Sequence, residues 1–225
     1  MLNDIRAFLF EALEAVPAVL FAITLHEYFH GLAAYFLGDD TAKRAGRLTL
    51  NPLKHLDPFG TLALIIFHFG WARPVPVNFW KLKHLRRDMV IVSLAGPISN
   101  LVAGFVTEFI YLKTGLFLYA RYAPLFSFPT IISNPYLSYL SDTVSLFILI
   151  NYVLFIFNLI PIPPLDGSKV LDAFLPNKYM NWVLKYEIYG TIILLVLILF
   201  GVVNVILGPS LNWLIGNAAY IFMMK

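Results

Sequence analysis

The sequence predicts an all-α polytopic membrane protein with about four full spans. Of its 225 residues, 60% are hydrophobic and 13% are charged, whereas a soluble domain is roughly 45–50% apolar and about 25% charged. The apolar residues gather in runs close to the length of a membrane-spanning helix, about 20 residues. Too few charged residues remain to cover a water-exposed surface, so we expect the lipid bilayer to cover much of the chain.

Four apolar runs are predicted to span the membrane. They cover about residues 12–37, 89–112, 144–160 and 188–207. A run at 59–69 falls below the roughly 17-residue lower limit for spanning, so we expect a re-entrant or partial segment. The tail at 213–224 is predicted to be an interfacial or partly inserted helix at best. No cleavable signal peptide is expected, because acidic residues surround Arg6 at the start of the chain.

The segment between the first two spans contains two extended stretches. Residues 47–50 alternate in polarity before Asn51-Pro52, which predicts a short strand in a small β-hairpin. The sequence Pro74-Val75-Pro76-Val77 is expected to be extended, because each proline disfavours helix at the residue before it.

The basic residues predict an orientation in the membrane. Most Lys and Arg lie within 39–88 or 169–185, whereas 114–141 contains only Arg121. Because Lys and Arg concentrate in cytoplasmic loops, the N-terminus is predicted to lie outside, and the first and third spans to end on the cytoplasmic side. This orientation explains the net charge of +3, so we expect no nucleic-acid partner.

The first span carries the motif His26-Glu27-Tyr28-Phe29-His30. Histidines four residues apart lie one helical turn apart on the same face, where both imidazoles can reach one Zn²⁺ at about 2.0–2.1 Å. Ionisable residues at membrane depth cost about 2.5–3.5 kcal/mol each, and a metal compensates that cost. The chain has no cysteine, so imidazole and carboxylate must hold the metal. We predict one Zn²⁺ per chain, inside the helix bundle.

Glu27 is predicted to be the general base. Zinc lowers the pKa of a bound water to about 7 and polarises a peptide carbonyl. Glu27 takes the proton of that water and passes it to the leaving nitrogen.

A catalytic zinc takes three protein ligands and leaves a fourth position open. Asp166 is the preferred third ligand, because it follows the proline-broken end of the third span. Non-helical backbone at membrane depth is tolerated where it lines a cavity. Read alone, Asp166-Gly167 is also a common turn signal. The competing third ligands are His55, Asp57, His68 and Asp172.

These motifs, taken together, resemble those of the site-2 protease family of intramembrane zinc metalloproteases. The matching segments are HEYFHG at 26–31, GRLTLNP at 46–52, GPISN at 96–100 and NLIPIPPLDG at 158–167. The resemblance implies Asp166 as third ligand and Glu27 as base, in a core of three spans. It also implies an active site sunk below the cytoplasmic membrane surface, and substrates that are single-span membrane proteins. The chain resembles a minimal form, without the PDZ or nucleotide-sensing domain of many relatives.

Further residues are candidates for substrate binding. In the family, the residues matching Asn100 and Asn158 are thought to bind the substrate backbone or the oxyanion, and an inter-helix hydrogen bond is the alternative. An exposed strand edge could pair with an unwound substrate. The residues of that edge are Arg47, Leu48, Thr49, Leu50 and Asn51.

The sequence therefore predicts a single multi-pass domain over 1–225 in the cell membrane. The family-like core covers about 12–172, and an extra span and tail cover about 188–225. The predicted function is regulated intramembrane proteolysis, and an oligomer or a regulatory membrane partner is compatible with it. The alternative is a non-proteolytic zinc-binding transporter or scaffold. Glu27 favours the protease, because a carrier needs no carboxylate beside, but not on, the metal.

Overall fold

A computed structural model of the chain describes residues 2–58, 60, 72–120, 134–175 and 187–223, and this part is mostly helical. The longer helices are α1 (Leu2–Phe36), α4 (Leu85–Lys113), α5 (Pro135–Asn158), α8 (Glu187–Leu199) and α9 (Val202–Met223). The shorter ones are α2 (Thr41–Arg44), α6 (Asp166–Asp172), η1 (Pro52–Lys54), η2 (Phe79–Lys81) and η3 (Leu116–Tyr119). The prediction of a helical protein is confirmed.

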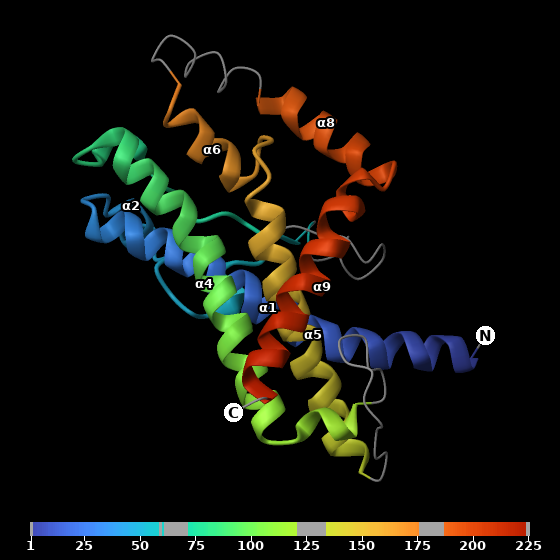
Figure 1. Ribbon diagram of the computed structural model, residues 1–225. Helices are drawn as coiled ribbons and strands as arrows, with labels where there is room; N and C mark the ends of the chain where they lie inside the picture. The colour runs from blue at the N-terminus through green and yellow to red at the C-terminus, as the bar shows by residue number, and fades with distance from the viewer. Residues whose placement is uncertain (1, 59, 61–71, 121–133, 176–186, 224–225) are drawn as a thin grey trace.

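Helices α1, α4 and α5 form the core of the bundle. Helix α4 packs against both α1 and α5, α1 also contacts α5, and α9 covers α4 and α5. Figure 1 shows α4, α5 and α9 running side by side, with α1 crossing them. Small residues bring these helices close: a Cβ added to Gly104 of α4 would lie 2.5 Å from the Tyr152 ring of α5. Close approach of this kind is typical of helix packing in membranes.

Three of the described helices are long and apolar enough to cross a membrane: α4, α5 and α9. The 35-residue α1 is not among these three described helices. The prediction of four full spans is therefore not confirmed. The predicted partial segment at 59–69 lies outside the described residues, apart from Gly60.

The end of the chain differs from the sequence prediction. The predicted fourth span is broken at Gly201, which has φ +70°, a left-handed conformation that only glycine adopts without strain. Helix α8 ends before this break and α9 begins after it. As far as Met223, the predicted interfacial or partly inserted tail is the second half of α9, a helix long and apolar enough to cross a membrane.

The predicted β-hairpin at 47–51 is not confirmed, because the described residues contain no strand. Local hydrogen bonds occupy the backbone groups that a ladder would need: Thr49 N–H donates to the Arg47 carbonyl, and the Thr49 carbonyl contacts the His55 ring. The isolated bridge in this region instead joins Leu56 to Ala72.

The start of α6 is set by the turn that follows α5. Helix α5 is capped by Asn134, whose side chain accepts hydrogen bonds from Tyr136 N and Leu137 N, and it ends at Asn158. The chain then folds back so closely that a Cβ on Gly167 would lie 2.4 Å from the Leu159 carbonyl oxygen. Only glycine fits there, directly after Asp166, the first residue of α6.

Candidate metal centre

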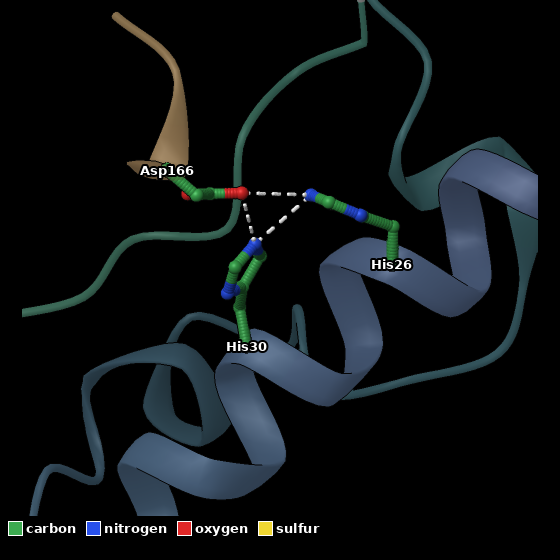
Figure 2. Close-up of side chains that lie close together, drawn as sticks. All are labelled: His26, His30 and Asp166. Carbon is green, nitrogen blue, oxygen red and sulfur yellow. Dashed lines mark hydrogen bonds and ion pairs between the residues drawn. The ribbon is translucent and has the colours of Figure 1, made fainter. Parts of the chain in front are cut away.

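His26, His30 and Asp166 meet inside the bundle. Nε2 of His26 lies 3.0 Å from Nε2 of His30, and Oδ2 of Asp166 lies 3.1 and 3.0 Å from the two nitrogens. Figure 2 shows the two rings on consecutive turns of α1, with the Asp166 carboxylate reaching them from another segment. All three residues are buried. The structure thus brings together the three residues that the sequence singled out as ligands.

The hydrogen bonds behind the two rings decide which nitrogens carry protons. His30 Nδ1 lies 2.7 Å from the Val92 carbonyl oxygen, which can only accept, so this nitrogen carries the proton. His26 Nδ1 lies 2.6 Å from Oδ1 of Asn100 and is a donor in the same way. In neutral imidazoles both Nε2 atoms then present lone pairs to each other and to the carboxylate. Three acceptors converging on one point need a cation, and two imidazoles with a carboxylate are a donor set typical of zinc.

Helix α4 holds the His30 ring in two ways. The Val92 carbonyl accepts from its Nδ1, and Gly96, one turn further on, leaves room for the ring. A Cβ on Gly96 would lie 2.3 Å from His30 Nε2, inside van der Waals contact. The position of this ring therefore depends on the absence of a side chain at residue 96.

Glu27 lies beside the cluster and is held by the extended segment that the sequence predicted at 74–77. Val75 N–H donates to Glu27 Oε2 at 2.6 Å. Asn78 N–H, at the end of the same segment, donates to the buried Asp39 carboxylate at 2.6 Å. One oxygen of Glu27 is thus fixed by the backbone, which leaves the other available for proton transfer.

A cavity of about 250 Å³ opens beside the cluster. Its lining includes His26, Glu27, His30 and Asp166 together with Val75 and Asn158. Among the described residues, Asn158 lines this cavity, whereas Asn100 and residues 47–51 do not. Asn158 Nδ2 donates to the Leu154 carbonyl at 3.0 Å.

Two opposing effects act on the Asp166 carboxyl. Burial raises its pKa, whereas hydrogen bonds from His26 and His30, which require a proton on Nε2, and the positive charge of Lys169 lower it below its usual value. Lys169 Nζ lies 3.3 Å from Oδ1, so it favours the ionised carboxylate also when the imidazoles are neutral. The ionised form is the one that binds a metal.

The competing third ligands point elsewhere, as far as the structure describes them. His55 Nε2 contacts the Thr49 carbonyl at 2.8 Å, and Asp57 Oδ1 accepts from Gly60 N at 2.8 Å. Asp172 lies at the far end of α6 from Asp166. His68 lies outside the described residues.

Some residues around the cluster were given no role by sequence reasoning. Gly96 was part of a matched motif, and its spacing of four from Asn100 and eight from Gly104 would have marked one face of α4. Val75 carried a signal only as part of an extended segment. Asn151 is a polar residue in the middle of a predicted span, and this position alone could have marked it as a candidate. It contacts Asn100.

Comparisons with known proteins assign the chain to a family. The family model of Peptidase family M50 matches residues 14–201. The inferred zinc metalloprotease YwhC of Bacillus subtilis is 40% identical over 212 residues, which cover 91% of this chain and 90% of the relative. The inferred zinc metalloprotease Rip2 of Mycolicibacterium smegmatis is 30% identical over 189 residues, or 82% of this chain and 66% of the relative. The Rip2 protein of Mycobacterium tuberculosis is 27% identical over 210 residues, or 90% and 70%.

No solved structure matches the chain. The family match nevertheless covers most of the sequence, and the YwhC relative is matched over nearly its whole length. The resemblance drawn from the sequence motifs is confirmed, and the chain belongs to peptidase family M50, the site-2 protease family of membrane metalloproteases.

Proposed function

We propose that this chain is a zinc metalloendopeptidase that hydrolyses peptide bonds of membrane-spanning proteins. The observation that carries the proposal is the convergence of His26 Nε2, His30 Nε2 and Asp166 Oδ2 within 3.0–3.1 Å of one another. These three atoms would hold one Zn²⁺ and leave a coordination position open toward the cavity. Bound zinc supplies a Lewis acid that lowers the pKa of water and polarises a peptide carbonyl.

The residues of the chain supply the proton transfers. Glu27 takes a proton from the attacking water as the water oxygen bonds to the carbonyl carbon of the substrate. It returns this proton to the leaving nitrogen as the carbon–nitrogen bond breaks. Asn158 lines the same cavity, and its amide is our candidate donor to the developing negative charge on the substrate oxygen. The substrate roles predicted for Asn100 and for residues 47–51 stay predictions.

The membrane context supports the choice of substrate. The metal residues lie in a bundle whose helices α4, α5 and α9 can span a bilayer, so a peptide bond that reaches them must come from a membrane-embedded or membrane-adjacent segment. We propose single-span proteins as substrates and regulated intramembrane proteolysis as the process. The basic residues within 39–88 favour a cell-membrane orientation with the site toward the cytoplasm. The whole chain is then one catalytic domain with its core at about 12–172.

The protein purified in detergent is expected to contain about one zinc per chain and to cut a reporter from a panel of single-span proteins. A chelator should stop cleavage as zinc leaves, and added zinc should restore it. Without the metal, the attacking water is not activated. Metal analysis and gel analysis of the reporters measure these results. Cleavage that persists after zinc is removed would contradict the proposal. Transport of zinc across the membrane of proteoliposomes, without cleavage of any reporter, would favour the transporter instead.

Gly96→Ala is expected to weaken zinc binding by about 10–100-fold, the range seen when residues that orient metal ligands are changed. The new methyl group would occupy the place of the His30 ring, 2.3 Å from Nε2. A competition titration with a chelating dye measures the affinity. Gly104→Ala is the matched control, because its methyl group would meet the Tyr152 ring at 2.5 Å, away from the metal. Equal zinc affinity in both variants would contradict the assignment of Gly96.

A further inference from the structure

We propose that Asn100 and Asn151 form a relay of two side-chain amides that orients His26 for the metal. The inference rests on the proposed zinc site and adds two positioning residues to it. Asn100 lies on α4 and Asn151 on α5, while His26 lies on α1. The relay therefore connects the three helices that form the core of the bundle.

Backbone carbonyls fix the direction of each amide. Nδ2 of Asn100 lies 3.0 Å from the Ala22 carbonyl oxygen, and a carbonyl can only accept, so the NH₂ group must face it. Oδ1 of Asn100 then faces His26 Nδ1 at 2.6 Å. His26 must carry its proton on Nδ1, which leaves the Nε2 lone pair directed at Asp166 and the metal position.

Asn151 accepts the second hydrogen of the Asn100 NH₂ group. Its own Nδ2 donates to the Phe147 carbonyl at 2.8 Å, so its Oδ1 is free to accept from Asn100 Nδ2, also at 2.8 Å. Both asparagines are fully buried, with 0% of their surface exposed. Neither side chain is exposed to solvent, and the contacts of the Asn100 NH₂ group with Asn151 and Ala22 set its orientation.

The two histidines are therefore held differently. The Nδ1 proton of His30 is fixed by a backbone carbonyl, that of Val92, which no side-chain substitution removes. His26 is oriented by a side chain that is itself oriented by another side chain. A metal site loses affinity for its ion when the side chain that orients a histidine ligand is changed, because the imidazole ring can then rotate or take the wrong tautomer.

This role differs from the substrate role predicted for Asn100. The amide has two N–H groups and one oxygen in the relay, and all are engaged: with Ala22, with Asn151 and with His26. Neither N–H group remains to donate to an oxyanion. Asn158, which lines the cavity, is better placed for that task.

The test compares zinc affinities, by competition with a chelating dye, of the full-length protein and its variants. Asn100→Leu and Asn151→Leu are expected to bind zinc about 10–100-fold more weakly. Asn100→Asp keeps an acceptor for the Nδ1 proton of His26, but its second oxygen would face the oxygens of Ala22 and Asn151 in place of the NH₂ group. This variant is therefore also expected to bind zinc more weakly than wild type. Asn217→Leu is the matched control: Asn217 on α9 donates to the Trp213 carbonyl four residues earlier, as Asn151 does to Phe147, but it is exposed.

The outcomes separate this inference from the proposed function. Wild type that binds no zinc would overturn both. Wild type that binds zinc and cleaves, with unchanged affinity in Asn151→Leu, would overturn the relay alone. Asn100→Leu and Asn100→Asp that both keep zinc but stop cleaving would assign Asn100 to the oxyanion instead. Thermal unfolding identifies a variant that does not fold; if Asn151→Leu fails, Asn151→Ala removes the same acceptor without added bulk and decides the question.

Discussion

Glu27→Gln is expected to lower peptide hydrolysis by about 10²–10⁴-fold, the usual contribution of a general base, while zinc stays bound at the wild-type level. The amide of glutamine cannot take the proton of the attacking water at neutral pH. It can still accept the hydrogen bond that Val75 N–H gives to Oε2 at 2.6 Å, so the extended segment should keep its place. Cleavage rate and bound zinc, measured on the same preparation, separate the loss of the base from the loss of the metal.

Glu108→Gln is the control for this substitution. Glu108 is a fully buried carboxylate on α4 that accepts a hydrogen bond from the Tyr152 hydroxyl at 2.5 Å, and it does not line the cavity. The substitution is chemically the same as at Glu27, but activity should remain. If Glu27→Gln cleaves as fast as wild type, another residue is the base and the proposed mechanism is wrong.

Local sequence patterns predicted the parts of the site that lie on one helix. His26 and His30 are four residues apart, and helical geometry alone brings their rings to one face. Asp166 is 136 residues from His30, and no spacing rule joins them. The prolines after α5 indicated a break at membrane depth, and the motif resemblance selected Asp166 among several candidates.

Contacts between helices could not be predicted in the same way. Hydropathy treats 188–207 as one run, because an isolated glycine inside a helix is often tolerated. It does not reveal that Gly201 takes a positive φ and divides α8 from α9. The strand predicted at 47–50 had a suitable alternation, but His55 takes the Thr49 carbonyl. The relay through Asn151 depends on which face of α5 meets α4, and a single sequence does not reveal that face.

Asp166→Ala is expected to remove zinc at concentrations where wild type is fully loaded, and to abolish cleavage with it. The loss of zinc affinity in this variant should exceed the loss of about 10–100-fold expected when a residue that only orients a ligand, such as Asn100, is changed. A carboxylate that binds the metal directly supplies both a bond and a negative charge. The two imidazoles alone would leave the ion with fewer than the three protein ligands of catalytic zinc sites. Metal analysis after dialysis against a weak chelator measures the loss.

The control for Asp166 lies on the same short helix. Asp172→Ala removes a carboxylate from the other end of α6 and should leave zinc and cleavage unchanged, which separates loss of a ligand from damage to the helix. Full zinc occupancy in Asp166→Ala would mean that the convergence of Oδ2 with the two Nε2 atoms does not mark the metal site. The third ligand would then have to be sought first at His68, because His55 and Asp57 are already bound to backbone groups. Loss of zinc in Asp166→Ala, with full zinc in Asp172→Ala, would establish that residues 136 positions apart hold one ion.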